Sequence, residues 1–295
     1  MYDIIIIGGG PAGLTSAIYA RRANKKTLLI ESTVCGGQML NTNNVENYPA
    51  VPATDGPSIA KAMEAQAKEL GTEIEFEEAI SVEKTDNGFI VRTETDNFEA
   101  KAVIIATGTK PRKLGLAAES KFESRGISYC ATCDGAIYKG KPVAVYGGGN
   151  SAFYEAECLS GLAEKVYLIH HHPEFKADEV LVEKAKNNPK IEILTNTEIT
   201  DLVGDKKLEK IITSEKEIAV DALFVAIGRI PCGVKLISDL NLDSDSYIIS
   251  DENGKTNIPG IFAAGDVREK KLRQIVTATA DGAAAASSAI EFLNN

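Results

Sequence analysis

Two cysteines two residues apart are the clearest chemical feature of the sequence, Cys130-Ala131-Thr132-Cys133, and Asp134 follows them directly. Thiols at this spacing can close a disulfide, open it again and pass on two electrons. A helix beginning near Cys130 would direct its N-terminal dipole at the sulfurs and favour a thiolate. Asp134 lies within reach of a sulfur and could carry the proton that accompanies the electrons. We therefore predict that Cys130, Cys133 and Asp134 carry the catalysis.

A zinc site is the alternative interpretation of this spacing, because half of a tetrahedral site looks the same. The sequence has no second pair of this kind and no histidine close to it, so we predict no metal. Cys35, Cys158 and Cys232 are expected to be inert thiols. An odd number of widely spread cysteines is not typical of a secreted disulfide framework, and it predicts a cytoplasmic protein with one working pair.

The composition limits the possible partners. A chain of 295 residues favours two domains, and 44% hydrophobic residues can form real cores. The net charge is −10, from 32 Lys and Arg against 42 Asp and Glu, which argues against nucleic acid as a partner. The apolar run at residues 4–7 is far shorter than the roughly 20 residues of a membrane span, and no basic segment precedes it. We therefore predict neither a membrane segment nor a signal peptide.

A dinucleotide-binding fingerprint opens the chain. A buried parallel strand is predicted at residues 3–7, followed by the glycine-rich residues 8–13, a helix to about residue 24 and a second strand at residues 27–30. Glu31 closes that strand, as the fingerprint requires. The glycines permit a tight turn, close approach of a pyrophosphate and close helix packing, while the acid binds ribose hydroxyls. The residues predicted to bind the dinucleotide here are Gly8, Gly10, Pro11, Ala12, Gly13 and Glu31.

Further polar and glycine-containing segments follow the fingerprint. Gln38 and Asn47 lie in segments that are either surface loops or contacts with a flavin ring. A helix is predicted at residues 58–70 with Ser58 as its cap, and a small antiparallel sheet between residues 73 and 99. After another buried strand at residues 103–105, the small residues Thr107 and Gly108 would let the backbone approach the cofactor.

The same organisation then repeats. A strand at residues 143–146 leads into a second glycine-rich turn at residues 147–152, a helix to about residue 162 and a strand at residues 165–169. The end of the chain, with a strand near residues 257–266 and a helix near residues 274–293, has no fingerprint and completes the first unit. We thus predict an α/β protein with two Rossmann-like dinucleotide-binding domains, the second inserted into the first. The predicted FAD-binding domain is 1–112 plus 237–295, and the inserted NAD(P)-like domain with the cysteine pair is 113–236.

The sequence resembles the low-molecular-weight thioredoxin reductases over essentially its whole length. The segments that carry the resemblance are spread along the chain: Gly8 to Gly13, Cys35 to Gln38, Val45 to Pro49, Tyr129 to Gly135, Ala263 to Val267 and Arg273 to Ala278.

This resemblance implies a homodimeric FAD enzyme that reduces thioredoxin through a redox-active disulfide, in a domain that rotates between flavin and partner. It implies that Cys133 faces the flavin, that Cys130 attacks the partner disulfide, and that Asp134 is the acid and base. Asp266 would hold the flavin ribitol. The residues implied beside the flavin ring are Arg273, Gln274 and Ile275.

One segment departs from the family pattern. NADPH-dependent members carry His-Arg-Arg-x-x-x-Arg after the second strand of the second unit, and their arginines bind the 2′-phosphate. Here the run at residues 170–176 has His171 and His172 at the leading arginines and Lys176 at the third. Losing two charge-assisted hydrogen bonds costs about 3–6 kcal/mol, or roughly a hundred- to ten-thousand-fold in affinity. We therefore expect a relic nucleotide site.

The altered run makes the chain most similar to the ferredoxin-linked, pyridine-nucleotide-independent branch of the family. Transfer from a ferredoxin near roughly −400 mV to a thioredoxin near about −270 mV is downhill by about 6 kcal/mol for two electrons. Since ferredoxins are usually acidic, docking would need a basic patch. The candidate clusters are Arg21, Arg22, Lys25 and Lys26; Lys110, Arg112 and Lys113; and Arg268, Lys270 and Lys271.

Three other functions remain open from the sequence. An NADPH-dependent thioredoxin reductase would need an unusual phosphate loop. A flavin dithiol oxidase that passes electrons from a small dithiol to oxygen would also need the cysteine pair and FAD. A flavin-bound redox sensor is less well matched, because a sensor has little need of the proton carrier Asp134.

Overall fold

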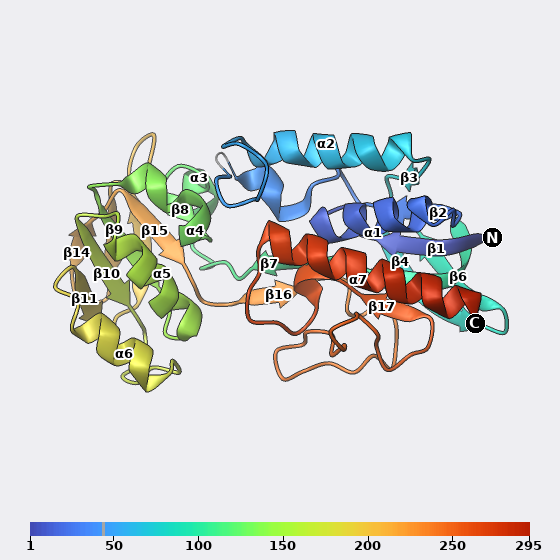
Figure 1. Cartoon of the computed structure of the whole chain (residues 1–295). Coiled ribbons are helices and arrows are strands. Elements are labelled where there is room, and N and C mark those ends of the chain that lie inside the picture. Colours follow the sequence, from blue (N-terminus) through green and yellow to red (C-terminus); the bar gives the residue numbers. More distant parts are fainter. Residues whose placement is uncertain (43–44) are drawn as a thin grey trace. The chain divides into compact units, whose positions relative to one another are not determined.

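The computed structural model of the chain describes residues 1–42 and 45–295, and it divides into two compact units (Figure 1). The first unit is Met1–Lys110 together with Ile230–Asn295, and the second is Pro111–Arg229. Each unit is an α/β structure with its own sheet. The predicted fold class, two Rossmann-like domains with the second inserted into the first, is therefore confirmed. Within the described residues no helix combines the length and the apolar character that a membrane crossing requires.

A seven-stranded mixed sheet forms the centre of the first unit, in the order β3-β2-β1-β6-β5-β4, with β17 also paired to β6. Strands β1, β2, β3 and β17 run parallel along it, whereas β4 and β5 form antiparallel pairs. The bounds are β1 Tyr2–Ile7, β2 Thr27–Ile30, β3 Glu73–Glu75, β4 Ala79–Thr85, β5 Gly88–Thr93, β6 Asn97–Ile105 and β17 Ile261–Ala263.

The continuous apolar run of β1 is explained by burial on both faces of this sheet. Ile4 and Ile6 pack into one apolar cluster and Ile5 and Ile7 into the other. The strand predicted at residues 103–105 is not separate, because it is the second half of β6, whose first half pairs antiparallel with β5. The small antiparallel sheet predicted before it is therefore an extension of the main sheet.

Among the described residues of the first unit, three helices and two short 3-10 turns accompany the sheet. Helices α1 and α7 lie side by side (Figure 1), and a Cβ on Gly282 would lie 2.2 Å from the Ala12 carbonyl oxygen, so glycine is required for this contact. The cap predicted at Ser58 is wrong: Asp55 caps α2 by accepting from the Ser58 backbone N–H (2.6 Å), and the helix begins earlier. The bounds are α1 Pro11–Arg22, η1 Gly37–Asn41, α2 Gly56–Glu69, η3 Gly265–Val267 and α7 Ile275–Asn294.

The second unit has a five-stranded parallel sheet in the order β11-β10-β9-β15-β8 and a small antiparallel sheet, β12-β13-β14. The strand bounds are β8 Ile127–Ser128, β9 Pro142–Tyr146, β10 Lys165–Ile169, β11 Ile191–Leu194, β12 Ile199–Val203, β13 Lys210–Thr213, β14 Glu217–Ala219 and β15 Ala222–Val225. The helical segments are α3 Glu119–Phe122, α4 Ala131–Asp134, η2 Gly135–Tyr138, α5 Asn150–Ser160 and α6 Glu179–Lys186.

The chain passes between the units through two strands that pair with each other, β7 (Thr109–Pro111) and β16 (Arg229–Pro231). The second passage occurs earlier than the predicted boundary at residue 237. Leu236 belongs to the apolar core of the first unit, and its carbonyl accepts from the Val82 N–H (2.7 Å). Residues 230–236 are therefore part of the first unit, a contact between distant segments that local sequence patterns do not reveal.

Candidate active site

The two cysteines of the Cys-x-x-Cys pair form a disulfide in the second unit. Cys130 follows β8 and caps α4, a single turn of helix, and both cysteines are half-buried. The Cys133 backbone N–H donates to the Cys130 sulfur over 3.2 Å. The helix predicted to begin near Cys130 is thus present but short, so one backbone N–H, rather than a long helix dipole, would stabilise a Cys130 thiolate.

The Asp134 carboxylate lies in the same turn and bonds to the strand that precedes it. Its Oδ2 accepts from the Ser128 hydroxyl over 2.6 Å. Burial raises the pKa of Asp134 above its ordinary value, and the Ser128 hydrogen bond acts in the opposite direction. A raised pKa suits a group that must hold and release a proton nearer neutral pH. The sequence prediction named Asp134 but assigned no role to Ser128.

A buried carboxylate anchors the segment before the cysteines. Glu119 is 4% exposed and accepts from the Tyr129 hydroxyl (2.8 Å) and from the backbone N–H groups of Leu114 and Gly115 (2.9 Å each). Burial and the Glu119 carboxylate raise the pKa of Tyr129, so the phenol stays a donor. Glu119 was not predicted as a functional residue. Nothing in the local sequence indicates that its carboxylate accepts hydrogen bonds from the backbone of Leu114 and Gly115.

The first glycine-rich turn has the geometry that a dinucleotide pyrophosphate requires. Gly8 has a φ of +107°, and a Cβ there would meet the Ala106 carbonyl oxygen at 2.4 Å. A Cβ on Gly13 would lie 1.8 Å from the Gly8 carbonyl oxygen, so α1 packs directly on the turn. Gly10 caps α1 without a side-chain hydrogen bond, and a Cβ there would have no neighbour nearer than 3.9 Å. Pro11 and Ala12 begin the helix, which leaves its N–H groups open to an anion.

Glu31 follows the end of β2, beside the glycine turn. Its Oε2 accepts from the Gly9 N–H over 2.7 Å and its Oε1 from the Thr33 N–H over 3.1 Å. The carboxylate is therefore fixed next to the turn, where a ribose of a dinucleotide would lie. Both hydrogen bonds that hold the Glu31 carboxylate come from backbone N–H groups, and the spacing of the motif does not predict these bonds.

Two segments meet in the structure, the loop with Asn47, interpreted as a surface loop or a flavin contact, and the segment that the resemblance places beside the flavin ring. The Asn47 side-chain N–H donates to the Gln274 Oε1 over 3.2 Å. Gln274 caps α7, and its backbone N–H bonds to the Thr277 hydroxyl (3.1 Å). Ile275 packs on the apolar cluster that holds the loop before α2, while Gln38 lies exposed in η1.

Thr107 and Gly108 pair with the returning chain. The Thr107 hydroxyl donates to the Cys232 carbonyl (2.5 Å), and the Gly108 carbonyl accepts from the Cys232 N–H (2.9 Å). Gly108 has a φ of +64°, and a Cβ there would meet no atom within 4 Å. The space directly beside Gly108 is therefore open, while Thr107 fixes the junction of the two segments.

Asp266 and Arg273 lie at the two ends of a turn that the half-buried acid Asp281 holds. Asp266 is half-buried in η3, and the Arg273 guanidinium lies 4.1 Å from the centre of the Tyr247 ring. Asp281 of α7 accepts from the Gly265 N–H (3.1 Å) and pairs with Arg268 (3.0 Å) and Lys270 (2.7 Å). Tyr247 and Asp281 were not predicted, although an acid in the apolar first half of α7 is a signal that could have been used.

The second glycine-rich turn also keeps a nucleotide-binding geometry. Gly147 has a φ of +156°, and a Cβ there would meet the Ala226 carbonyl oxygen at 2.3 Å. Gly149 caps α5 without a side-chain hydrogen bond, and a Cβ there would meet nothing within 4 Å. Asn150 and Asp178 bond to each other, so the loop after β10 is tied to the start of α5 (3.0 and 2.8 Å). The backbone at the start of α5 is therefore open, as it is at the start of α1.

The three histidines after β10 separate into one buried and two exposed rings. His170 is 6% exposed and stacks on Phe175 with ring centres 5.4 Å apart, and burial lowers its pKa. His171 and His172 are exposed, with ring centres 4.0 Å apart. They follow the strand rather than lying in it, since β10 ends at Ile169. Among the described residues no group of three potential ligands is placed to hold a metal ion.

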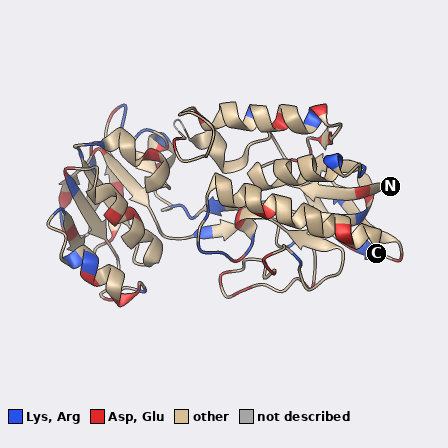
Figure 2. Cartoon of the chain, viewed as in Figure 1, with Lys and Arg blue, Asp and Glu red and all other residues tan. Residues whose placement is uncertain are grey.

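Some members of the basic clusters suggested for ferredoxin docking have partners within the chain. Figure 2 shows basic and acidic residues interspersed along both units. A member of each cluster bonds to a neighbouring carbonyl or carboxylate, which lowers its value as a free positive surface. The contacts are Arg21 with the carbonyls of Leu70 and Lys25, Lys113 with Glu123, and Arg268 and Lys270 with Asp281.

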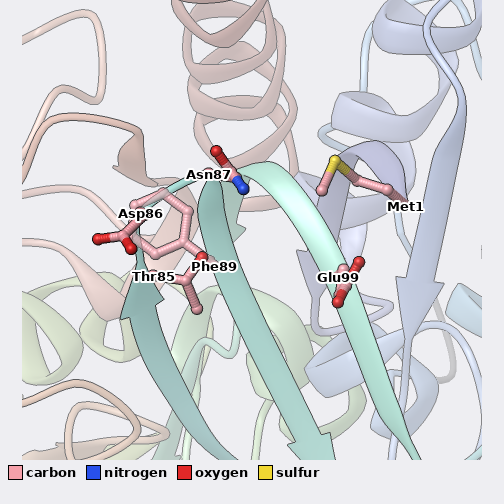
Figure 3. A pocket seen from close by; sticks show the side chains of 6 residues that line it. All are labelled: Met1, Thr85, Asp86, Asn87, Phe89 and Glu99. Atoms are coloured by element: carbon pink, nitrogen blue, oxygen red, sulfur yellow. The ribbon is translucent and has the colours of Figure 1, made fainter.

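A surface pocket in the first unit lies apart from these residues in the sequence. It has a volume of about 260 Å³, and Figure 3 shows the side chains around it. The lining residues are Met1, Thr85, Asp86, Asn87, Phe89 and Glu99. None of the predicted site residues lines it, so the pocket plays no part in the site.

Comparison with known proteins defines the class. The sequence matches the pyridine nucleotide-disulphide oxidoreductase family over residues 2–282, and the chain belongs to this family. FAD is the cofactor of this chain, as predicted from the sequence. The first glycine-rich turn has the geometry to hold FAD.

Individual relatives have more specific descriptions. A thioredoxin reductase of Treponema pallidum is 42% identical over 301 residues, covering 99% of this chain and 97% of the relative. The crystal structure of the thioredoxin reductase from Streptococcus pyogenes MGAS5005 matches with a TM-score of 0.90 and 38% identity, over 100% of this chain and 98% of that one. A ferredoxin-flavin thioredoxin reductase from Clostridium acetobutylicum matches with a TM-score of 0.56 and 32% identity, over 99% and 98%.

Proposed function

We propose that the protein reduces the disulfide of thioredoxin with electrons from NADPH, through FAD and the Cys130–Cys133 pair. The observation that carries the proposal is a disulfide with an adjacent half-buried acid, in a chain whose two glycine-rich turns both leave the start of a helix open. Relatives that align with 99% of the chain are described as thioredoxin reductases, and the family description names a pyridine nucleotide.

In the proposed reaction the reduced pair delivers two electrons by thiol–disulfide exchange. The Cys130 thiolate attacks one sulfur of the thioredoxin disulfide, and the other thioredoxin sulfur leaves with a proton. The Cys133 thiolate then attacks Cys130, which restores the Cys130–Cys133 disulfide and releases the second thioredoxin thiol. Asp134 gives its proton to the first leaving sulfur, takes up the proton of the Cys133 thiol as that sulfur attacks, and passes this proton to the second leaving sulfur. The Cys133 N–H that bonds to the Cys130 sulfur supports Cys130 as the attacking thiolate.

The bound FAD supplies the two-electron step that links a nicotinamide to the disulfide. The chain would hold its pyrophosphate at the start of α1, and Glu31 would bind its ribose. Asp266, Arg273, Gln274 and Asn47 are proposed to contact the rest of the cofactor, as the resemblance implies. The hydrogen bond between the Asn47 and Gln274 side chains supports the proposal that both residues contact the same part of the cofactor.

NADPH is proposed as the donor in place of the ferredoxin expected from the sequence. The second glycine turn is open at Gly149, and Lys176 is held there by a backbone bond to the Gly148 carbonyl (2.9 Å). At least one residue of each basic cluster that ferredoxin would require has a partner within the chain. His171 and His172 in place of arginine lower the affinity for the 2′-phosphate, and we expect weaker binding of NADPH than arginines would give.

A ferredoxin-linked reaction is a second candidate because of one observation, the absence of arginine at residues 171 and 172. The ferredoxin-flavin thioredoxin reductase from Clostridium acetobutylicum, which is 32% identical to this chain, supports this second candidate. The two candidates share the thioredoxin step and differ only in the donor.

An anaerobic titration of the flavin absorbance separates them. NADPH, NADH and reduced ferredoxin are added to separate samples, and oxidised thioredoxin is added afterwards. We expect NADPH to bleach the flavin and thioredoxin to restore it. Bleaching by ferredoxin alone, with restoration by thioredoxin, would contradict the proposed donor and establish the second candidate.

We also propose that the chain acts as a homodimer in the cytoplasm. The proposal rests on the resemblance and on the few, scattered cysteines of the sequence. Sedimentation of the purified flavoprotein tests the oligomeric state, and a mass near 31.5 kDa would contradict the dimer.

A further inference from the structure

Ser128 links the two reactive parts of the cysteine turn through one hydroxyl group. It is the last residue of β8, 5% exposed, and paired with Phe224 of β15. Its Oγ donates to the Asp134 Oδ2 over 2.6 Å and accepts from the Cys130 backbone N–H over 3.2 Å. A parallel sheet thus fixes the hydroxyl, and the hydroxyl fixes both the acid and the start of the cysteine turn.

The surroundings of Asp134 make this hydrogen bond important for its charge. Burial disfavours the carboxylate, and the Ser128 hydroxyl favours it. Tyr138 of η2 faces the same carboxylate, and the charge of Asp134, after burial, raises the pKa of that phenol. Cys130 and Cys133 complete the titratable groups of the turn. Because its pKa is raised, the Tyr138 phenol stays protonated and places no charge beside the carboxylate.

We propose that Ser128 is a positioning residue whose hydroxyl holds the Asp134 carboxylate against the cysteine turn and sets the pH range in which Asp134 donates its proton. The inference rests on the proposed role of Asp134 and extends it to a residue outside the Cys-x-x-Cys-Asp motif. According to this inference, the pH dependence of thiol–disulfide exchange is set by Ser128 of β8 and not only by the residues of the Cys-x-x-Cys-Asp motif.

The test uses the holoenzyme reduced in advance with dithionite and mixed with oxidised thioredoxin in a single turnover, so the nucleotide donor is irrelevant. The rate is measured between pH 4 and 10, so that the range begins at the ordinary pKa of a carboxyl group. In Ser128→Ala the carboxylate loses its donor and holds its proton to higher pH. We expect the alkaline decline of the rate to move up by about one to two pH units, the shift that corresponds to a hydrogen bond to a charged group.

Three further variants serve as controls for the effect of Ser128→Ala. Ser128→Thr keeps the hydroxyl and should retain the unmodified pH profile. Ser160→Ala removes an equally buried hydroxyl, which bonds to the Glu157 carbonyl, and should also leave the profile unchanged. Asp134→Asn should abolish the decline, and Ser128→Ala should then have no further effect on the profile.

Two outcomes would overturn the inference, and they are distinguishable. If Ser128→Ala leaves the decline in place while Asp134→Asn removes it, Asp134 acts without help from Ser128. If Asp134→Asn itself leaves the decline unchanged, the proposed role of Asp134 fails and the role of Ser128 fails with it.

Discussion

At the scale of single residues, the two cysteines of one helical turn differ in what they contact. Cys130 receives the Cys133 N–H at its sulfur, and its own N–H goes to Ser128. A hydrogen bond to sulfur favours the charged thiolate, which is the nucleophile in exchange. The two thiols are therefore not interchangeable, even though the motif looks symmetrical.

Cys130→Ser should lower thioredoxin turnover by at least about a thousandfold, because it removes the sulfur proposed to attack. FAD content and reduction of the flavin by the donor should remain. Steady-state reduction of thioredoxin measures the effect, and Cys158→Ser, at an exposed free cysteine, is the control. Turnover close to that of the unmodified protein would show that Cys133 is the attacking residue.

Restoring arginine at His171 and His172 tests what the exposed histidine pair has replaced. Two charge-assisted contacts to the 2′-phosphate should tighten NADPH binding about a hundred- to ten-thousand-fold. NADH lacks this phosphate, so its affinity should not change, which makes it a matched control on the same protein. Equilibrium titration with each nucleotide is the measurement. Equal changes for both nucleotides would mean that these residues do not contact the phosphate.

At the scale of elements, close backbone packing decides whether each glycine turn can exist. Gly13→Ala would bring a Cβ to 1.8 Å from the Gly8 carbonyl oxygen, so α1 must move away from β1. We expect loss of most bound flavin and a stability lower by about 1–3 kcal/mol. Flavin absorbance per protein and urea denaturation measure the two effects.

Gly161→Ala is the matched control for that substitution. Its φ of −71° suits any residue, and its nearest neighbour would be the Cys158 carbonyl oxygen at 3.5 Å, an ordinary contact. Full flavin content in Gly13→Ala would show that α1 can shift without opening the cofactor site.

The elements also show what the sequence could and could not predict. Both fingerprints, their strands and the dithiol turn follow from local patterns, since glycine spacing and apolar runs have direct physical causes. Some missed residues, Ser128 and Glu119, act on the chain within ten residues of themselves, whereas others act over longer separations. Asp281 holds Gly265 and its turn, Tyr247 lies under Arg273, and Leu236 returns to the core near Val82. Such contacts depend on how the elements pack, which no local pattern contains.

At the scale of the whole molecule, pH acts on stability through a buried acid of the second unit. Burial raises the pKa of Glu155 from 4.5 to about 7, and the charge of Arg229 opposes this shift. The folded state thus binds a proton more readily than the unfolded state. Stability should therefore fall as pH rises from about 4.5 to about 7, by up to about 3 kcal/mol, and this loss is complete above pH 7.

Glu155→Gln should remove this loss. The variant should match the unmodified protein near pH 4.5 and exceed it in stability at pH 8 by up to about 3 kcal/mol. Urea denaturation of both proteins at the two pH values measures the difference. Glu183→Gln, at an exposed glutamate paired with Lys186, is the control and should show no such dependence. A constant difference between variant and unmodified protein at both pH values would contradict the buried-acid explanation.

The paired strands β7 and β16 bring both ends of the inserted unit together. The Arg112 N–H donates to the Gly228 carbonyl over 3.0 Å, so residues 111–229 begin and end at one place. A segment with adjacent ends can be removed from a gene and replaced by another of different length without stretching the remaining chain. We therefore expect that the unit with the disulfide can be exchanged as a whole while the seven-stranded sheet of the first unit keeps its strand order.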